Sequence, residues 1–394
     1  MRVWNDDQRA LREAFSKWHE ALSADHIEQD RNSVFPKDKW ELVRESGILR
    51  LPFDAQWGGL GQDLLTTMYI LEGLGYGCRD GGLNFSVSTH IASTGVPIHR
   101  FGSADLKERY MPRICDGASI GAHAITEPQS GSDAMSMRTM ATVEGGSYIL
   151  NGSKTFVTNG PVADLFAVYA RTKPGQGPWG VTAFLVERST PGFTIGQPID
   201  KMGLRTSPLC ELFFDDCRVP AENVIGRSGA GFLILDYVMK WEILCSFIIN
   251  VGEMQHRLER CLEYAKTRTQ FGQPIGSFQS VSNKIIDMRI GVDTARKWLY
   301  DTAWRFSNHE NVTTDIAISK LLASESNVAS AMAAIQIFGG KGYMAEYGLE
   351  KDLRNAVAGT IYSGTSETQR NRIAAMLGLA FRTAAAQAQD TNGG

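Results

Sequence analysis

The chain has 394 residues, of which 43% are hydrophobic, enough to bury a large core divided between two or three domains. Its 40 basic and 43 acidic side chains leave a net charge of −3. This balance gives no electrostatic reason to expect nucleic acid or an anionic membrane as a partner, and it favours a small substrate without strong charge.

Export and membrane insertion are not expected. The N-terminus turns acidic at once and lacks the apolar stretch of a secretory signal. The most apolar long region, residues 232–251, contains Asp236, Lys240 and Glu242, which are costly at a bilayer centre, so we interpret it as a buried helix. Six cysteines without a C-x-x-C pair or a matched histidine spacing predict reduced thiols, a cytoplasmic location and no metal site.

Helical periodicity opens the chain. Over residues 6–24, hydrophobic side chains recur at intervals of four, three and four from Leu11 to Leu22, which predicts one amphipathic helix. The helical pattern continues, and we predict an N-terminal helical domain over residues 1–120.

Strand-like runs fill the middle third. Residues 139–143 and 148–150 flank a short turn that contains two glycines, which predicts a hairpin. Further runs, separated by proline and glycine clusters, lie at residues 165–170, 181–186 and 209–214. We predict a middle β domain over residues 121–228.

Helical signals return after Gly229 in four stretches, at residues 230–267, 280–308, 313–337 and 366–388. Their lengths are typical of a four-helix bundle. We predict a C-terminal helical bundle over residues 229–384, followed by a frayed polar tail over 385–394. The predicted fold class is α+β.

Five segments resemble, in order and spacing, the signatures of the acyl-CoA dehydrogenase family. They are TEPQSGSD at 126–133, KTFVTNG at 154–160, RTQFG at 268–272, QIFGGKG at 336–342 and IYSGTSETQR at 361–370. The resemblance covers almost the whole chain and implies the same order of domains, FAD as cofactor, and a homotetramer or dimer. No G-x-G-x-x-G opens a βαβ unit, which disfavours a Rossmann mode of binding.

The resemblance implies two groups of cofactor-binding residues. The group at the flavin is His123, Ile125, Thr126, Ser132, Phe156, Thr158, Thr365 and Glu367. The group at the dinucleotide, in this family often across a subunit interface, is Arg268, Phe271, Gln279, Gln336, Gly339 and Gly340. An arginine fork and glycine backbone suit phosphates. Taken alone, however, Arg268 is equally a solvated cation, the glycines a helix cap, and His123 a packed histidine.

The reaction needs a base for the proton next to the thioester carbonyl and donors for the enolate-like oxygen. The best-known members of the family carry the base, a glutamate, at the position of Ser363. The backbone N–H of Ser363 remains as an oxyanion donor, but a serine without a partner base cannot replace a carboxylate.

Glu242 is the candidate replacement. Its neighbours one helical turn away are apolar or small, which predicts a buried carboxylate with a raised pKa. The alternative is a solvated helix glutamate. The isovaleryl-CoA dehydrogenase branch takes its base from this helix, and the resemblance aligns that base with Glu242.

The substrate contacts are predicted beside these two residues. They are Lys240 and Trp241 next to Glu242, Tyr362 and Gly364 next to Ser363, and Ser132. With FFDDCRVP at 213–220, these segments most resemble dehydrogenases that oxidise prolyl groups on peptidyl carrier proteins. Ile243 follows the glutamate where most relatives have arginine, which removes a cation.

Three functions stay open from the sequence. The favoured one is FAD-dependent α,β-dehydrogenation of a prolyl-like or small acyl thioester on a carrier protein, ahead of a branched short-chain acyl-CoA dehydrogenase. The second is a flavin oxidase or monooxygenase on the same fold. The third is a catalytically silent protein that binds acyl carriers.

Overall fold

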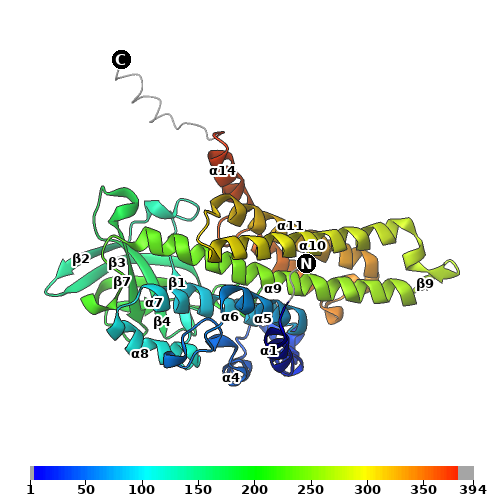
Figure 1. Ribbon diagram of the computed structural model, residues 1–394, viewed down its shortest axis with the longest axis horizontal. Helices are drawn as coiled ribbons and strands as arrows, with labels where there is room; N and C mark the ends of the chain where they lie inside the picture. The colour runs from blue at the N-terminus through cyan, green and yellow to red at the C-terminus, as the bar shows by residue number, and fades with distance from the viewer. Residues whose placement is uncertain (1–3, 380–394) are drawn as a thin grey trace, which may run out of the picture.

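The computed structural model describes residues 4–379 and joins a β-sheet to a long helical body (Figure 1). Along the chain, helices come first, then the strands of the sheet, then the longest helices. This is the predicted order.

The N-terminal part is helical, as predicted. Its helices are α1 (Asp6–Ser16), α2 (His19–Ser23), α3 (His26–Asn32), α4 (Lys37–Ser46), α5 (Leu64–Gly77), α6 (Gly81–Ser88), the π-helix η3 (Thr89–Gly95), α7 (Val96–Phe101) and α8 (Ala104–Cys115). The single helix predicted over residues 6–24 is wrong. A tightened turn, closed by a 3.2 Å bond from the Trp18 N–H to the Phe15 carbonyl, interrupts the i→i−4 ladder between α1 and α2.

The sheet has the strand order β6-β7-β3-β2-β4-β5-β8, and β1 pairs in parallel with β4. Its strands are β1 (Gly121–Ala124), β2 (Met140–Glu144), β3 (Ser147–Thr158), β4 (Leu165–Arg171), β5 (Val181–Glu187), β6 (Phe193–Ile195), β7 (Leu209–Pro220) and β8 (Val224–Ile225). The predicted hairpin is confirmed as β2 and β3. Gly145 and Gly146 both have positive φ, as its two-residue turn requires.

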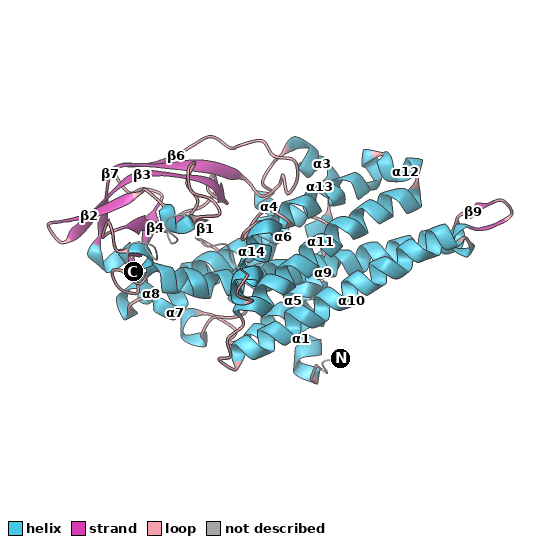
Figure 2. Cartoon of the chain, turned by 90° about the horizontal axis from the view of Figure 1, so that it is seen from above, coloured by secondary structure: helices cyan, strands magenta, loops and turns pink. Residues whose placement is uncertain are grey.

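Three long helices dominate the C-terminal part: α9 (Gly231–Thr267), α10 (Gln279–Ser307) and α11 (Thr313–Phe338). They run side by side away from the sheet (Figure 2). Shorter elements follow them: β9 (Thr269–Gln270), β10 (Gln273–Pro274), α12 (Gly340–Tyr343), α13 (Leu349–Gly359) and α14 (Ser366–Met376). Within residues 4–379, α11 is the one helix that is long and apolar enough to span a membrane by length and composition. It packs against both α9 and α10.

Two predictions for this part need correction or a limit. The helix predicted over residues 366–388 ends at Met376, because Gly378 takes a positive φ of 76°. Helix α13 was not predicted. The end of that predicted helix and the polar tail over 385–394 lie outside the described residues.

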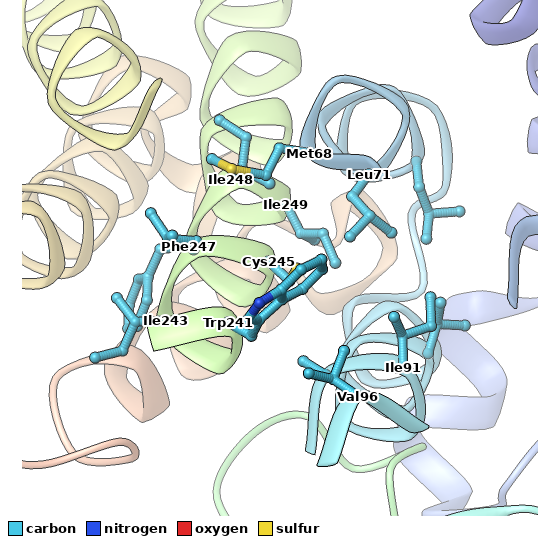
Figure 3. Packing of buried hydrophobic residues seen from close by; sticks show 14 of the residues in the cluster. Met68, Leu71, Ile91, Val96, Trp241, Ile243, Cys245, Phe247, Ile248 and Ile249 are labelled. Carbon is cyan, nitrogen blue, oxygen red and sulfur yellow. The ribbon is translucent and has the colours of Figure 1, made fainter. Parts of the chain in front are cut away.

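Helix α9 is fixed laterally by close contact with α5. A Cβ added to Gly75 would lie 2.0 Å from the Ile249 carbonyl oxygen, and one on Gly252 would lie 2.2 Å from that of Glu72. Figure 3 shows α9 side chains packing near Met68 and Leu71 of α5. Since the backbones nearly touch, α9 cannot slide, and its polar side chains are held in register.

Candidate active site

The carboxylate of Glu242 lies where three other elements reach α9. The Ser93 hydroxyl of η3 donates to its Oε2 at 2.7 Å, and the Ser363 hydroxyl, ahead of α14, donates to its Oε1. Nδ1 of His123 on β1 lies 3.4 Å from Oε2. The side chains of Glu242 and His123 are only 16% and 6% exposed. The structure therefore brings together the predicted residues His123, Glu242 and Ser363.

Strand β1 and the π-helix η3 are locked together, which places Ser93 and His123 beside the same carboxylate oxygen. The Gly121 N–H donates to Nδ1 of His90 at 3.1 Å, and the Thr94 hydroxyl donates to the Ala122 carbonyl at 3.1 Å. Ser93 was not predicted. A lone serine in a helical segment gives no signal, because its partner is 149 residues away.

Ser363 sits in a tight turn with φ 54°, followed by Gly364 with φ 87°. The Gln369 side chain donates to the Ser363 carbonyl at 2.8 Å and so holds the turn against α14. Among the described residues, the Ser363 N–H donates to no backbone carbonyl. This N–H is therefore free for a substrate oxygen.

The pKa of Glu242 is the reverse of the prediction. Burial works to raise it, but the neighbouring His123 imidazole, together with the Ser363 and Ser93 hydroxyls, holds the pKa below its ordinary value. The predicted raised pKa is wrong because these partners come from other elements. The carboxylate is ionised at neutral pH and can accept a proton.

A small cavity of about 10 Å³ lies along α9 and reaches Tyr362, the residue before Ser363. Its lining is Gly81, Phe85, Leu204, Ser246, Ile249, Asn250, Glu253, Asn355 and Tyr362. Its polar wall is α9, because Ser246, Asn250 and Glu253 follow Glu242 by 4, 8 and 11 residues and share its face. Asn250 accepts from the Tyr362 hydroxyl at 3.4 Å and donates to Glu253 at 3.2 Å. Burial raises the pKa of Glu253.

Near the sheet, several residues predicted to contact the flavin surround an open aromatic face. Phe156 is 63% exposed although it lies within β3, while Thr126 and Thr158 are half-buried. The Ser132 hydroxyl accepts from Thr368 at 3.2 Å and joins the loop after β1 to α14. An exposed aromatic ring flanked by threonines fits a planar cofactor, because the fold itself leaves that face uncovered.

The remaining residues that were predicted to contact the flavin make contacts within the protein itself. The Ile125 carbonyl accepts from Lys154 at 3.0 Å, Thr365 caps α14, and Glu367 lies in the first turn of α14.

The predicted dinucleotide group lies at the opposite end of the helical body. Its members, all exposed, are Arg268, Phe271, Gln279, Gln336, Gly339 and Gly340. Figure 2 shows β9 and α12, which neighbour them, far from the sheet. From Glu242 to Arg268, α9 rises by about 39 Å at ~1.5 Å per residue. Added Cβ atoms at Gly339 and Gly340 would meet nothing, so their backbone is open to a ligand. Within one chain, the two predicted cofactor groups are not brought together.

Two predicted substrate residues point elsewhere. Lys240 pairs with Asp236 and lies 5.9 Å from the centre of the Phe306 ring. Trp241 packs in the hydrophobic core, and Figure 3 shows it on the side of Ile91 and Val96. Ile243 is also buried in the core.

A second buried carboxylate lies at the sheet. Lys154 Nζ is 2.8 Å from Oε1 of Glu127, and both side chains are almost fully buried. Glu127 also accepts the backbone N–H groups of Arg138 at 2.5 Å and Thr139 at 2.9 Å. Burial lowers the pKa of Lys154 to about 8, and the charge of Lys154 holds the pKa of Glu127 down against burial. This pair ties the loop after β1 to β3.

Comparison with known proteins covers the whole described chain. Models of the acyl-CoA dehydrogenase N-terminal, middle and C-terminal domains match residues 5–118, 122–217 and 229–378. An L-prolyl-[peptidyl-carrier protein] dehydrogenase from a Serratia species is 41% identical over 363 residues, 91% of this chain and 94% of the relative.

Two solved structures are similar over 96% of this chain. The crystal structure of the prolyl acyl carrier protein oxidase AnaB has a TM-score of 0.93, 42% identity and 100% coverage of that chain. PigA with FAD and proline has a TM-score of 0.93, 39% identity and 99% coverage.

Proposed function

The chain belongs to the acyl-CoA dehydrogenase family, as its sequence predicted, and within this FAD-dependent family we propose that it dehydrogenates a small polar acyl thioester, prolyl-like, on a peptidyl carrier protein. The observation that carries this proposal is the Glu242 carboxylate, ionised and held at a turn with a free backbone N–H. The named relative acts on L-prolyl groups attached to a carrier protein, which supports the substrate class.

The residues divide the reaction between them. Glu242 accepts the proton from the carbon next to the thioester carbonyl, and the Ser363 N–H donates to the carbonyl oxygen as negative charge develops there. When bound, FAD supplies the hydride acceptor. Phe156, Thr126, Thr158 and Thr365 are proposed to hold its ring system.

The cavity along α9, whose lining includes Tyr362, is narrow, which supports a compact acyl group over a long one. It has room for about one water molecule, and Phe85 and Tyr362 narrow it. A long alkyl chain would place apolar surface against the polar side chains of Asn250 and Glu253 at this wall, which disfavours such substrates.

Two further proposals follow from the positions of the cofactor residues. Because the flavin and dinucleotide groups lie at opposite ends of α9, we propose that two chains share each FAD, in a dimer or tetramer. A cytoplasmic location stays a prediction.

The proposed base is tested with Glu242→Gln. After anaerobic addition of prolyl carrier protein, the variant is expected to bleach its flavin about 100-fold or more slowly than the wild type. Glu263→Gln, an exposed glutamate on the same helix, is the matched control. A Glu242→Gln protein that binds FAD and bleaches it at the wild-type rate would sink the assignment.

The substrate is tested on the wild type with prolyl, isovaleryl and straight-chain acyl groups, each on CoA and on a carrier domain. Faster bleaching by prolyl carrier protein supports the proposal. Faster bleaching by isovaleryl-CoA contradicts it. Stoichiometric peroxide under air identifies an oxidase, and carrier binding without bleaching identifies a silent binding protein.

A further inference from the structure

We propose that His123 is a positioning residue for Glu242, and that its imidazole holds the carboxylate toward β1. The inference rests on the proposed function only for the role of Glu242 as base. The contact itself, with Nδ1 of His123 3.4 Å from Oε2 of Glu242, is a feature of the fold.

The two ring nitrogens of His123 have different surroundings. Nδ1 faces the carboxylate, whereas Nε2 is buried and has no hydrogen-bond partner among residues 4–379. With one nitrogen committed, the ring orientation is set by Glu242. The ring also packs edge-on against Tyr169, with centroids 5.3 Å apart, so it cannot easily turn away.

In the described part of the chain, His123 is the one basic side chain within 4 Å of the Glu242 carboxylate, and it is charged only when protonated. From the other elements packed around the carboxylate, Ser93 and Ser363 contribute neutral hydroxyls. Burial and the charge of Glu242 raise the pKa of Tyr169, and burial with the charges of Glu253 and Glu242 raises that of Tyr362, so both phenols stay neutral. The nearest lysine on α9, Lys240, pairs with Asp236 instead.

Loss of the His123 charge should therefore have a specific effect. Only the Ser93 and Ser363 hydroxyls would then oppose the effect of burial, and the pKa of Glu242 would rise. A base with a higher pKa is protonated at higher pH, so activity would be lost earlier on acidification. A histidine that merely fills space would not move this limit.

Three variants separate charge, hydrogen bond and packing. His123→Gln keeps an N–H donor without charge, His123→Leu removes both, and Tyr169→Phe changes the neighbouring ring alone. The pH dependence of anaerobic flavin bleaching is measured for each. We expect the apparent acidic pKa to rise by about 1 unit or more in His123→Leu, by less in His123→Gln, and not in Tyr169→Phe.

A second readout does not depend on the substrate. Isotope-edited infrared spectra report the protonated carboxyl of Glu242 directly, with Glu242→Gln as the blank. If no acyl thioester bleaches the flavin, the proposed function fails, yet the infrared titration still decides whether His123 lowers the pKa of Glu242.

FAD content and thermal melting are checked for all variants, and His123→Gln serves if His123→Leu does not fold. A His123 variant that loses the same fraction of activity at every pH, with the infrared titration unmoved, would overturn the inference. A titration shifted to higher pH supports it.

Discussion

Glu127 at the sheet and Glu242 on α9 both have pKa values held below the ordinary range, although burial works to raise each of them. Glu127 is almost fully buried, and a lysine and two backbone N–H groups are directed at it. Glu242 keeps some exposure, and its partners are two hydroxyls and an imidazole. Glu127 is paired with a buried lysine, whereas Glu242 has no lysine or arginine partner among the described residues and keeps part of its side chain exposed.

This difference separates a structural carboxylate from a reactive one. A buried ion pair is destabilising when one partner is removed, because the other charge stays uncompensated. Neutral donors around a carboxylate orient it without closing it off, and a proton can still reach it.

The largest effect is expected at the sheet. Lys154→Met leaves Glu127 charged and buried without its partner, and should lower the free energy of unfolding by about 3–5 kcal/mol. Urea unfolding at pH 7 measures it. Glu242→Gln, at the other carboxylate, is the control and should cost much less. Equal losses for the two variants would remove the distinction drawn here.

Acidification should lower the stability that the Glu127–Lys154 pair contributes. The pKa of Glu127 is lowered by folding, so its stabilisation is present above the ordinary glutamate pKa and is lost as the pH falls below it. The double variant Glu127→Leu with Lys154→Met should recover most of the lost stability at pH 7, to within about 1 kcal/mol of the wild type. Its free energy of unfolding should also fall less than that of the wild type as the pH drops below the ordinary glutamate pKa. An unchanged acid sensitivity would contradict this account.

A change in the lining of the cavity should alter the preference for the acyl group of the substrate. Glu253→Leu makes the cavity wall apolar, and the ratio of kcat/KM for straight-chain over prolyl thioesters should rise about tenfold. Glu263→Leu, exposed on the same helix, controls for the change of residue type. A ratio that does not move would show that the cavity does not contact the acyl group.

The smallest effect is expected from Ser363→Ala. The variant loses one of several groups that lower the pKa of Glu242. The apparent acidic pKa of flavin bleaching should therefore rise by about half a pH unit, less than in His123→Leu. The backbone N–H is kept, and the rate at pH 8 should therefore stay near that of the wild type. A large loss at pH 8 would assign the hydroxyl a direct role.

Local patterns predicted the fold well where local physics decides it. Gly145 and Gly146 predicted the hairpin because only such residues take positive φ at both turn positions at low cost. Periodicity predicted α9, α10 and α11 to within a residue of their observed ends. It failed between α1 and α2, where one i→i−3 bond interrupts the helix without a proline or glycine to mark it.

The site was predictable only in part. Apolar neighbours on α9 correctly indicated that Glu242 is largely buried. These neighbours could not predict the direction in which the pKa of Glu242 shifts, because its partners Ser93 and Ser363 are 149 and 121 residues away in the sequence. Long-range contacts of this kind depend on tertiary packing, which periodicity does not encode. The resemblance supplied His123, but as a flavin contact rather than a partner of the carboxylate.

In the π-helix η3, the number of residues matters as well as their side chains. A π-helix bonds i→i+5 and holds an extra residue in the turn compared with an α-helix. Deleting one residue between Thr89 and Ser93 would let the α pitch resume and would remove the wide turn that holds Ser93 beside Glu242. Ser93 would then leave Glu242 without any change of side chain. In evolutionary terms, a one-residue gap here in a relative marks a different environment for the base, even when every residue around the carboxylate is the same.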